Sequence, residues 1–198
     1  MRTTVTRLFG LRPLALAVAT MIAVASSAHA AVVSYQVTLD GPSESPANAS
    51  LGIGIAQVDV DATAHTMRVQ IFAFSGLSGT TTACHIHAPT TTALTGTAGV
   101  ATTTPYFAGF PIGVTSGSYS NLLDMTLASS YNPSYVTANG GTTATAEVAL
   151  FAAIAAGKAY LNIHSSVYGG GEIRGFLIPG VPVATTPSTW GRIKQLYR

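Results

Sequence analysis

Residues 51–74 read LGIGIAQVDVDATAHTMRVQIFAF. Apolar and polar side chains alternate within two runs, 51–60 and 66–74, and a short polar segment that ends at His65 joins them. Alternation with a period of two is typical of strands that bury one face. The stretch therefore predicts an antiparallel β-hairpin, and we expect His65 to be a solvated imidazole at its turn.

Similar runs recur on both sides of this hairpin. Further strands are predicted at residues 32–39, 81–87, 119–127, 159–165 and 172–178, with a glycine-rich turn between the last two. One long helix is predicted at residues 143–156, with a buried stripe made of Val148, Leu150, Phe151 and Ile154. Asn132-Pro133 begins a turn or a short helix. The sequence is thus mostly β, with one inserted α-helix.

The first thirty residues predict a signal peptide. They combine three arginines, an apolar run at residues 14–24 and the cleavage pattern Ala28-His29-Ala30. We expect the mature chain to begin at Ala31 and to be exported, to the periplasm or the extracellular space. Because the apolar run is short for a permanent membrane span, no stable transmembrane anchor is expected after cleavage.

The remaining chain divides into one domain, residues 31–179, and a Pro/Thr linker with a short basic tail, residues 180–198. Within the tail, Pro187-Ser188-Thr189-Trp190 resembles the start of a PEP-CTERM sorting signal. The formal charge of +2 includes the three arginines of the first thirty residues, so the rest of the chain carries about −1. No basic patch remains that would favour a nucleic-acid partner.

Three of the five histidines lie in two short motifs, CHIHAP at residues 84–89 and YLNIHS at residues 160–165. Side chains alternate across a strand, so His85 and His87 share one face and Cys84 points to the other. Asn162 and His164 share a face in the same way. Cys84 is the only cysteine, which excludes an intramolecular disulfide, and we expect it to be a buried structural thiol.

The histidines admit two interpretations. Two imidazoles on one strand and a third on a neighbouring strand can hold copper or zinc, with His85, His87 and His164 as the ligands. Alternatively, these side chains hydrogen-bond to the backbone and to nearby polar groups and keep the strands in register.

Three further residues complete one polar cluster under either interpretation. They are Asn162, Glu172 and Arg174. Glu172 and Arg174 share the parity of one strand face and can pair with each other or with His164. A carboxylate beside His164 would orient a metal ligand from the second coordination shell, whereas an Arg–carboxylate pair would be structural.

The two motifs resemble the signature of the CHRD domain, a module named after chordin that also occurs in many exported bacterial proteins. The matching features follow in order: His-Ile-His-Ala-Pro, a Gly-rich stretch, a helix ending in Ala-Gly-Lys-Ala-Tyr, Asn-Ile-His, and Gly-Gly-Glu-Ile-Arg-Gly-Phe-Leu. They extend from about Val33 to Ile178. The resemblance implies an antiparallel β-sandwich or barrel of immunoglobulin-like character, and it implies no particular reaction.

The sequence contains no G-x-S-x-G elbow, P-loop or H-E-x-x-H motif, so we assign no catalytic residue. The function that we expect is a non-enzymatic binding or structural module of the cell envelope or extracellular space, with a protein or glycan partner. The alternative is a copper- or zinc-binding protein that uses the His-x-His pair and His164. A redox enzyme built on such a copper site is a third hypothesis.

Overall fold

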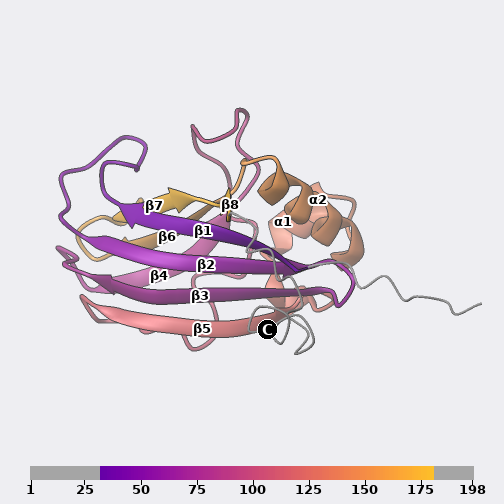
Figure 1. Cartoon of the computed structure of the whole chain (residues 1–198), viewed down its shortest axis with the longest axis horizontal. Helices are drawn as coiled ribbons and strands as arrows, with labels where there is room; N and C mark the ends of the chain where they lie inside the picture. The colour runs from indigo at the N-terminus through magenta and orange to yellow at the C-terminus, as the bar shows by residue number, and fades with distance from the viewer. Residues whose placement is uncertain (1–31, 181–198) are drawn as a thin grey trace, which may run out of the picture.

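The computed structural model describes residues 32–180, and these residues form one curled antiparallel sheet with two helices at one end (Figure 1). Its strands are β1 (Val33–Asp40), β2 (Ile53–Asp61), β3 (Thr66–Ser75), β4 (Thr81–His87), β5 (Gly117–Asp124), β6 (Tyr160–Ser165), β7 (Ile173–Phe176) and β8 (Ile178–Pro179). The expected signal peptide and the C-terminal tail lie outside the described residues.

The strand order is β4-β6-β7-β1-β2-β3-β5, and β8 pairs with β1. Figure 1 shows β1, β2, β3 and β5 in front of β4, β6 and β7, so the curled sheet encloses its own core. Fully buried side chains from both halves fill this space, among them Leu39, Val58, Met67, Ile71, Phe74, Ile86, Leu161, Ile163 and Ile173. The predicted antiparallel sandwich or barrel is confirmed, including the hairpin of β2 and β3.

Two helices lie at one end of the sheet. The short helix α1 (Pro133–Ala138) begins after Asn132, whose side chain accepts a hydrogen bond from the Ser134 amide. The longer helix α2 (Thr143–Ala155) begins after Thr142, which caps it in the same way. The turn-or-helix alternative at Asn132-Pro133 is therefore decided in favour of a helix.

The predicted buried stripe of α2 is partly wrong. Leu150 and Ile154 are buried, but Val148 is 71% exposed, because two residues turn a helix by about 200° and place Val148 opposite Leu150. Glu147 is buried instead. Its carboxylate lies 3.0 Å from His65 Nδ1 at the β2–β3 turn, where His65 is otherwise half exposed.

The free edge of β4 is covered by the long connection between β4 and β5. Backbone hydrogen bonds join Cys84 to Pro105 and to Phe107, and Thr81 to Val114. Phe107 is buried there and covers the core. This connection also brings loop carbonyls over the outer face of β4. No helix among residues 32–180 has the length and apolarity that a membrane span requires.

Candidate metal centre

Strands β4 and β6 are antiparallel neighbours, and their register brings the two histidine motifs together. His85 pairs with Asn162, and Ala83 pairs with His164, so His85 and His164 are diagonal neighbours on one face. Cys84 points into the core and is fully buried, which confirms the predicted structural thiol. The predicted division of the β4 side chains between two faces is therefore correct.

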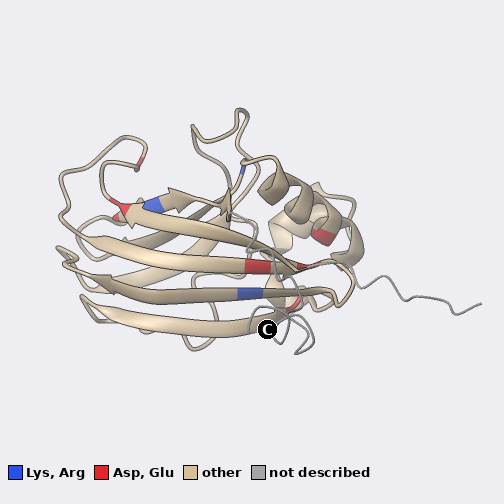
Figure 2. Cartoon of the chain, in the orientation of Figure 1, with Lys and Arg blue, Asp and Glu red and all other residues tan. Residues whose placement is uncertain are grey.

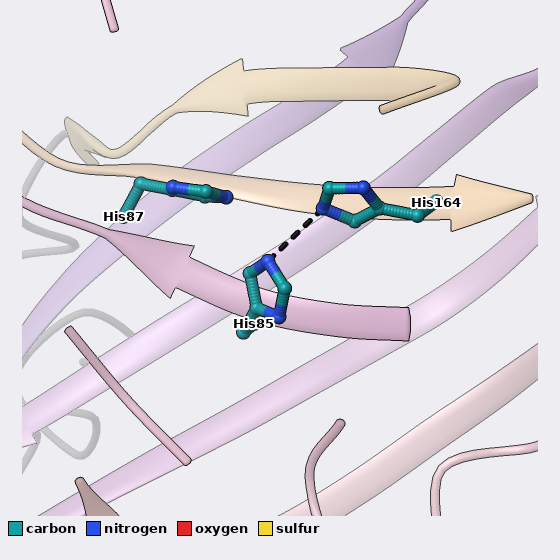
Figure 3. Close-up of side chains that lie close together, drawn as sticks. All are labelled: His85, His87 and His164. Atoms are coloured by element: carbon teal, nitrogen blue, oxygen red, sulfur yellow. Dashed lines mark hydrogen bonds between the residues drawn. The ribbon is translucent and has the colours of Figure 1, made fainter. Parts of the chain in front are cut away.

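The three histidine rings gather on the outer face of β4 and β6 (Figure 3). Their available ligand nitrogens all lie within 4.8 Å of one another. The shortest separation is 3.0 Å, between Nε2 of His85 and Nε2 of His164. The three side chains are only 5–8% exposed, because loops from several parts of the chain cover them. We call His85, His87 and His164 the histidine trio.

Each member of the histidine trio is oriented by a backbone carbonyl of a covering loop. The pairs of Nδ1 and carbonyl oxygen are His85 with Pro105 at 2.9 Å, His87 with Ala98 at 2.8 Å, and His164 with Gly169 at 3.0 Å. A carbonyl oxygen only accepts hydrogen bonds, so each Nδ1 must donate and carries a proton. In the neutral rings, all three Nε2 atoms therefore carry a lone pair.

In this tautomer none of the three Nε2 atoms carries a proton, so none of them can donate a hydrogen bond to another. A conventional hydrogen bond across the 3.0 Å contact of His85 and His164 requires one of these rings to be an imidazolium. Burial opposes that charge: desolvation, and then the neighbouring histidines, lower the pKa of His85 to about 3. Desolvation also lowers the pKa of His87 to about 4 and lowers that of His164.

The result is a buried pocket of lone pairs. Nε2 of His87 is buried and has no hydrogen-bond partner among residues 32–180. A cation placed between the three nitrogens would relieve this arrangement, since it accepts all three lone pairs at once. The chemistry of the donors fits zinc or copper, both of which bind neutral imidazole nitrogen.

The geometry of the His85–His164 pair is close to what such an ion needs, whereas His87, whose ligand nitrogen lies within 4.8 Å of the other two, would have to move closer. At a zinc–nitrogen distance of about 2.0–2.1 Å, tetrahedral ligands stand about 3.3 Å apart. The 3.0 Å separation between His85 and His164 therefore needs a shift of only a few tenths of an ångström. Carbonyl acceptors on the second ring nitrogen are the usual orienting partners of histidine ligands.

Of the predicted polar cluster, Asn162 and Arg174 adjoin the histidine trio and Glu172 does not. Asn162 lies between His85 and Arg174 in one row across β4, β6 and β7. Its Oδ1 is buried and has no partner within the described chain. Glu172 instead accepts hydrogen bonds from the Ser50 hydroxyl and from backbone amides of the loop after β3. No bond joins it to His164 or Arg174 within residues 32–180.

Two residues that the sequence did not single out adjoin this site. Tyr160 stacks on His87, with ring centres 4.6 Å apart and planes 8° apart, and it shares the strand parity of Asn162 and His164. That parity could have identified it. Glu44 lies 3.8 Å from Arg174 and comes from the loop after β1, where no local pattern marks it.

The family model for the CHRD domain matches residues 35–177. The match includes most of β1, all of β2–β7 and all three members of the histidine trio. No curated protein and no solved structure matches the chain. On the strength of this match and of the antiparallel fold, the chain belongs to the CHRD domain family.

Proposed function

We propose that this CHRD domain is an exported, non-enzymatic binding module of the cell envelope or extracellular space, and that it binds a copper or zinc ion through His85, His87 and His164. One observation carries the metal proposal. The three Nδ1 atoms donate to loop carbonyls, so three buried Nε2 lone pairs converge with no proton between them.

A purely structural role for the histidine trio accounts less well for this arrangement. The loop hydrogen bonds of Nδ1 would hold the strands and loops in place without any metal. They do not explain why Nε2 of His85 and His164 approach to 3.0 Å with both lone pairs facing each other. A buried polar atom without a donor or acceptor costs about 1–3 kcal/mol, which an ion would offset.

Export and the non-enzymatic role rest on the sequence. The first thirty residues have the charge, apolar run and cleavage pattern of a signal peptide. No nucleophile with an adjacent base is apparent in the motifs, and Cys84 is turned away from the histidines into the core. A protein or glycan of the envelope would be the partner of such a module.

Calorimetric titration of the purified protein tests the metal proposal. We expect one ion to bind per chain, using Zn²⁺, Cu²⁺ and, under a reductant, Cu⁺ as separate probes. His87→Ala should weaken binding by at least about 100-fold, because it removes a nitrogen that contacts the ion, and loss of a group that only orients such a ligand already costs about 10–100-fold. His65→Ala is the matched control, since His65 lies at the β2–β3 turn and pairs with Glu147.

Two results would contradict the proposal. One is the absence of stoichiometric binding of any of the three ions to the wild-type protein. The other is equal loss of binding in His87→Ala and His65→Ala, which would place the ion outside the histidine trio.

Removal of the metal should also destabilise the fold. An ion present at about 100 times its Kd raises the unfolding free energy by about 2.7 kcal/mol. For a domain of this size, that corresponds to roughly 5–10 °C in Tm. We expect a chelator to lower the Tm of the metal-loaded wild type by this amount and to leave His87→Ala unchanged; thermal unfolding followed by circular dichroism measures both.

A further inference from the structure

Arg174 is a buried cation held at a fixed position near the histidine trio. It is the only Lys or Arg of β7 (Figure 2), and it is 4% exposed. The guanidinium donates from Nε to the Ser43 carbonyl and from Nη1 to the Gly96 carbonyl. These two loop contacts prevent it from turning toward solvent.

The ring of Tyr160 lies between the guanidinium of Arg174 and the ring of His87. Its guanidinium carbon lies 4.7 Å from the ring centre of Tyr160, and that ring stacks on His87 at 4.6 Å. Because β6 lies between β4 and β7, Tyr160 separates the two groups. The guanidinium carbon is thus no more than about 9 Å from the His87 ring, with a buried side chain in between.

Glu44 offsets only part of this charge. One carboxylate oxygen lies 3.8 Å from Arg174 Nε, beyond hydrogen-bond distance. The other oxygen is buried without a partner within residues 32–180. Burial raises the pKa of Glu44 to about 7, so the carboxylate is incompletely ionised at neutral pH.

The trio itself supplies no negative charge to a bound ion. Among the described residues, the only potential ligands that gather at this point are the three imidazoles. A bound Zn²⁺ or Cu²⁺ would keep its charge of +2 in a buried site, whereas Cu⁺ would keep +1. The cost of desolvating an ion grows with the square of its charge, so the divalent ions are disfavoured about fourfold more in energy.

Resting on the proposed metal site, we infer that the histidine trio holds Cu⁺ in preference to divalent ions, and that the guanidinium of Arg174 sets this preference. Two unit charges about 9 Å apart at an effective dielectric of about 20 repel enough to change an affinity by roughly twentyfold. A divalent ion is repelled by two such factors and a monovalent ion by one, so the charge of Arg174 changes the ratio of their affinities by one factor. The chain would then bind copper in its reduced state, Cu⁺.

Competition titrations with chromophoric chelators measure this preference, with Cu⁺ under anaerobic reducing conditions and Zn²⁺ as the two probes. We expect wild type to bind Cu⁺ more tightly than Zn²⁺. Arg174→Gln, which removes the charge, should lower the ratio of Cu⁺ to Zn²⁺ affinity by roughly twentyfold. Arg174→Lys, which keeps the charge, should leave the ratio within about threefold of wild type.

A second variant keeps the inference testable if Arg174→Gln does not fold. Glu44→Gln removes the partial counter-charge at nearly constant volume and should raise the same ratio several-fold. The inference is overturned if wild type prefers Zn²⁺, if Arg174→Gln and Arg174→Lys change the ratio equally, or if Glu44→Gln leaves it unchanged. If neither ion binds wild type at all, the proposed metal site itself fails.

Discussion

Acidification from pH 7 to pH 4 is expected to remove at least about 3 kcal/mol from the unfolding free energy of the metal-free protein. In the folded chain, burial holds the pKa of His85 at about 3 and that of His87 at about 4. In the unfolded chain both take up protons below about pH 6.5. The unfolded state therefore binds more protons, and stability falls as the pH drops from 6.5 toward 3–4.

The contribution of Glu44 to the pH dependence of stability has the opposite sign and is smaller than that of the histidines. Its pKa is raised to about 7, so the folded state retains a proton that the unfolded state loses above about pH 4.5. Acidification over that interval stabilises the fold by about 3 kcal/mol, at 1.36 kcal/mol for each pKa unit. The two histidines together contribute about 6 kcal/mol between pH 7 and pH 4, and the lowered pKa values of His164 and Glu172 act in the same direction, so the net effect is destabilising.

Denaturant unfolding at several pH values, in the presence of a chelator, measures this balance. His85→Gln should flatten the dependence between pH 6.5 and pH 4, because the variant lacks the titrating ring. Glu44→Gln should steepen it. A wild-type stability that is constant from pH 7 to pH 4, or that is equally steep in His85→Gln, would show that the rings are not held neutral by the fold.

Gly175→Ala is expected to destabilise the protein by about 4 kcal/mol or more. A Cβ at this position would overlap the backbone carbonyl of Thr38 and would lie 2.9 Å from Cγ1 of Val37. Both neighbours belong to β1, and the obstructing carbonyl is backbone, so relief requires separating β7 from β1 next to the Asp40–Arg174 pair. The variant should therefore also displace Arg174 from the histidine trio.

Gly170→Ala is the control for this substitution. Nothing lies within 4 Å of a Cβ at Gly170, which lies in the turn between β6 and β7, whereas Gly175 lies within β7. We expect it to leave the unfolding free energy within about 0.5 kcal/mol of wild type, as for ordinary surface substitutions. Equal stability of the two variants would contradict the close packing of β7 on β1.

Much of this fold could be predicted because local patterns determine it. Alternation identified the main strands, and strand parity alone placed His85 and His87 opposite Cys84. The pairing of β6 with β7 followed from the short glycine-rich turn between them. Val148 was misassigned because hydrophobicity does not say which side of a helix meets the sheet, and α2 packs its alanines and Glu147 inward.

Strand parity placed Asn162 beside the trio, but the position of Glu44 could not be predicted, because it depends on contacts between distant parts of the chain. Glu44 and Arg174 are brought together by the loop after β1 and by β7. Glu172 follows the parity of Arg174 in sequence. It nevertheless lies just before β7 begins, where the hydroxyl of Ser50 and loop amides bind its carboxylate.

The location of a bound metal decides whether the histidine trio is a metal site. Crystals of the copper-loaded protein, with diffraction recorded across the copper absorption edge, would give an anomalous map in which the ion is identified by element. We predict one peak at about 2.0–2.2 Å from Nε2 of His85, His87 and His164. A peak at His65 or on exposed carboxylates, with the trio free of metal, would show that the three histidines do not bind the ion.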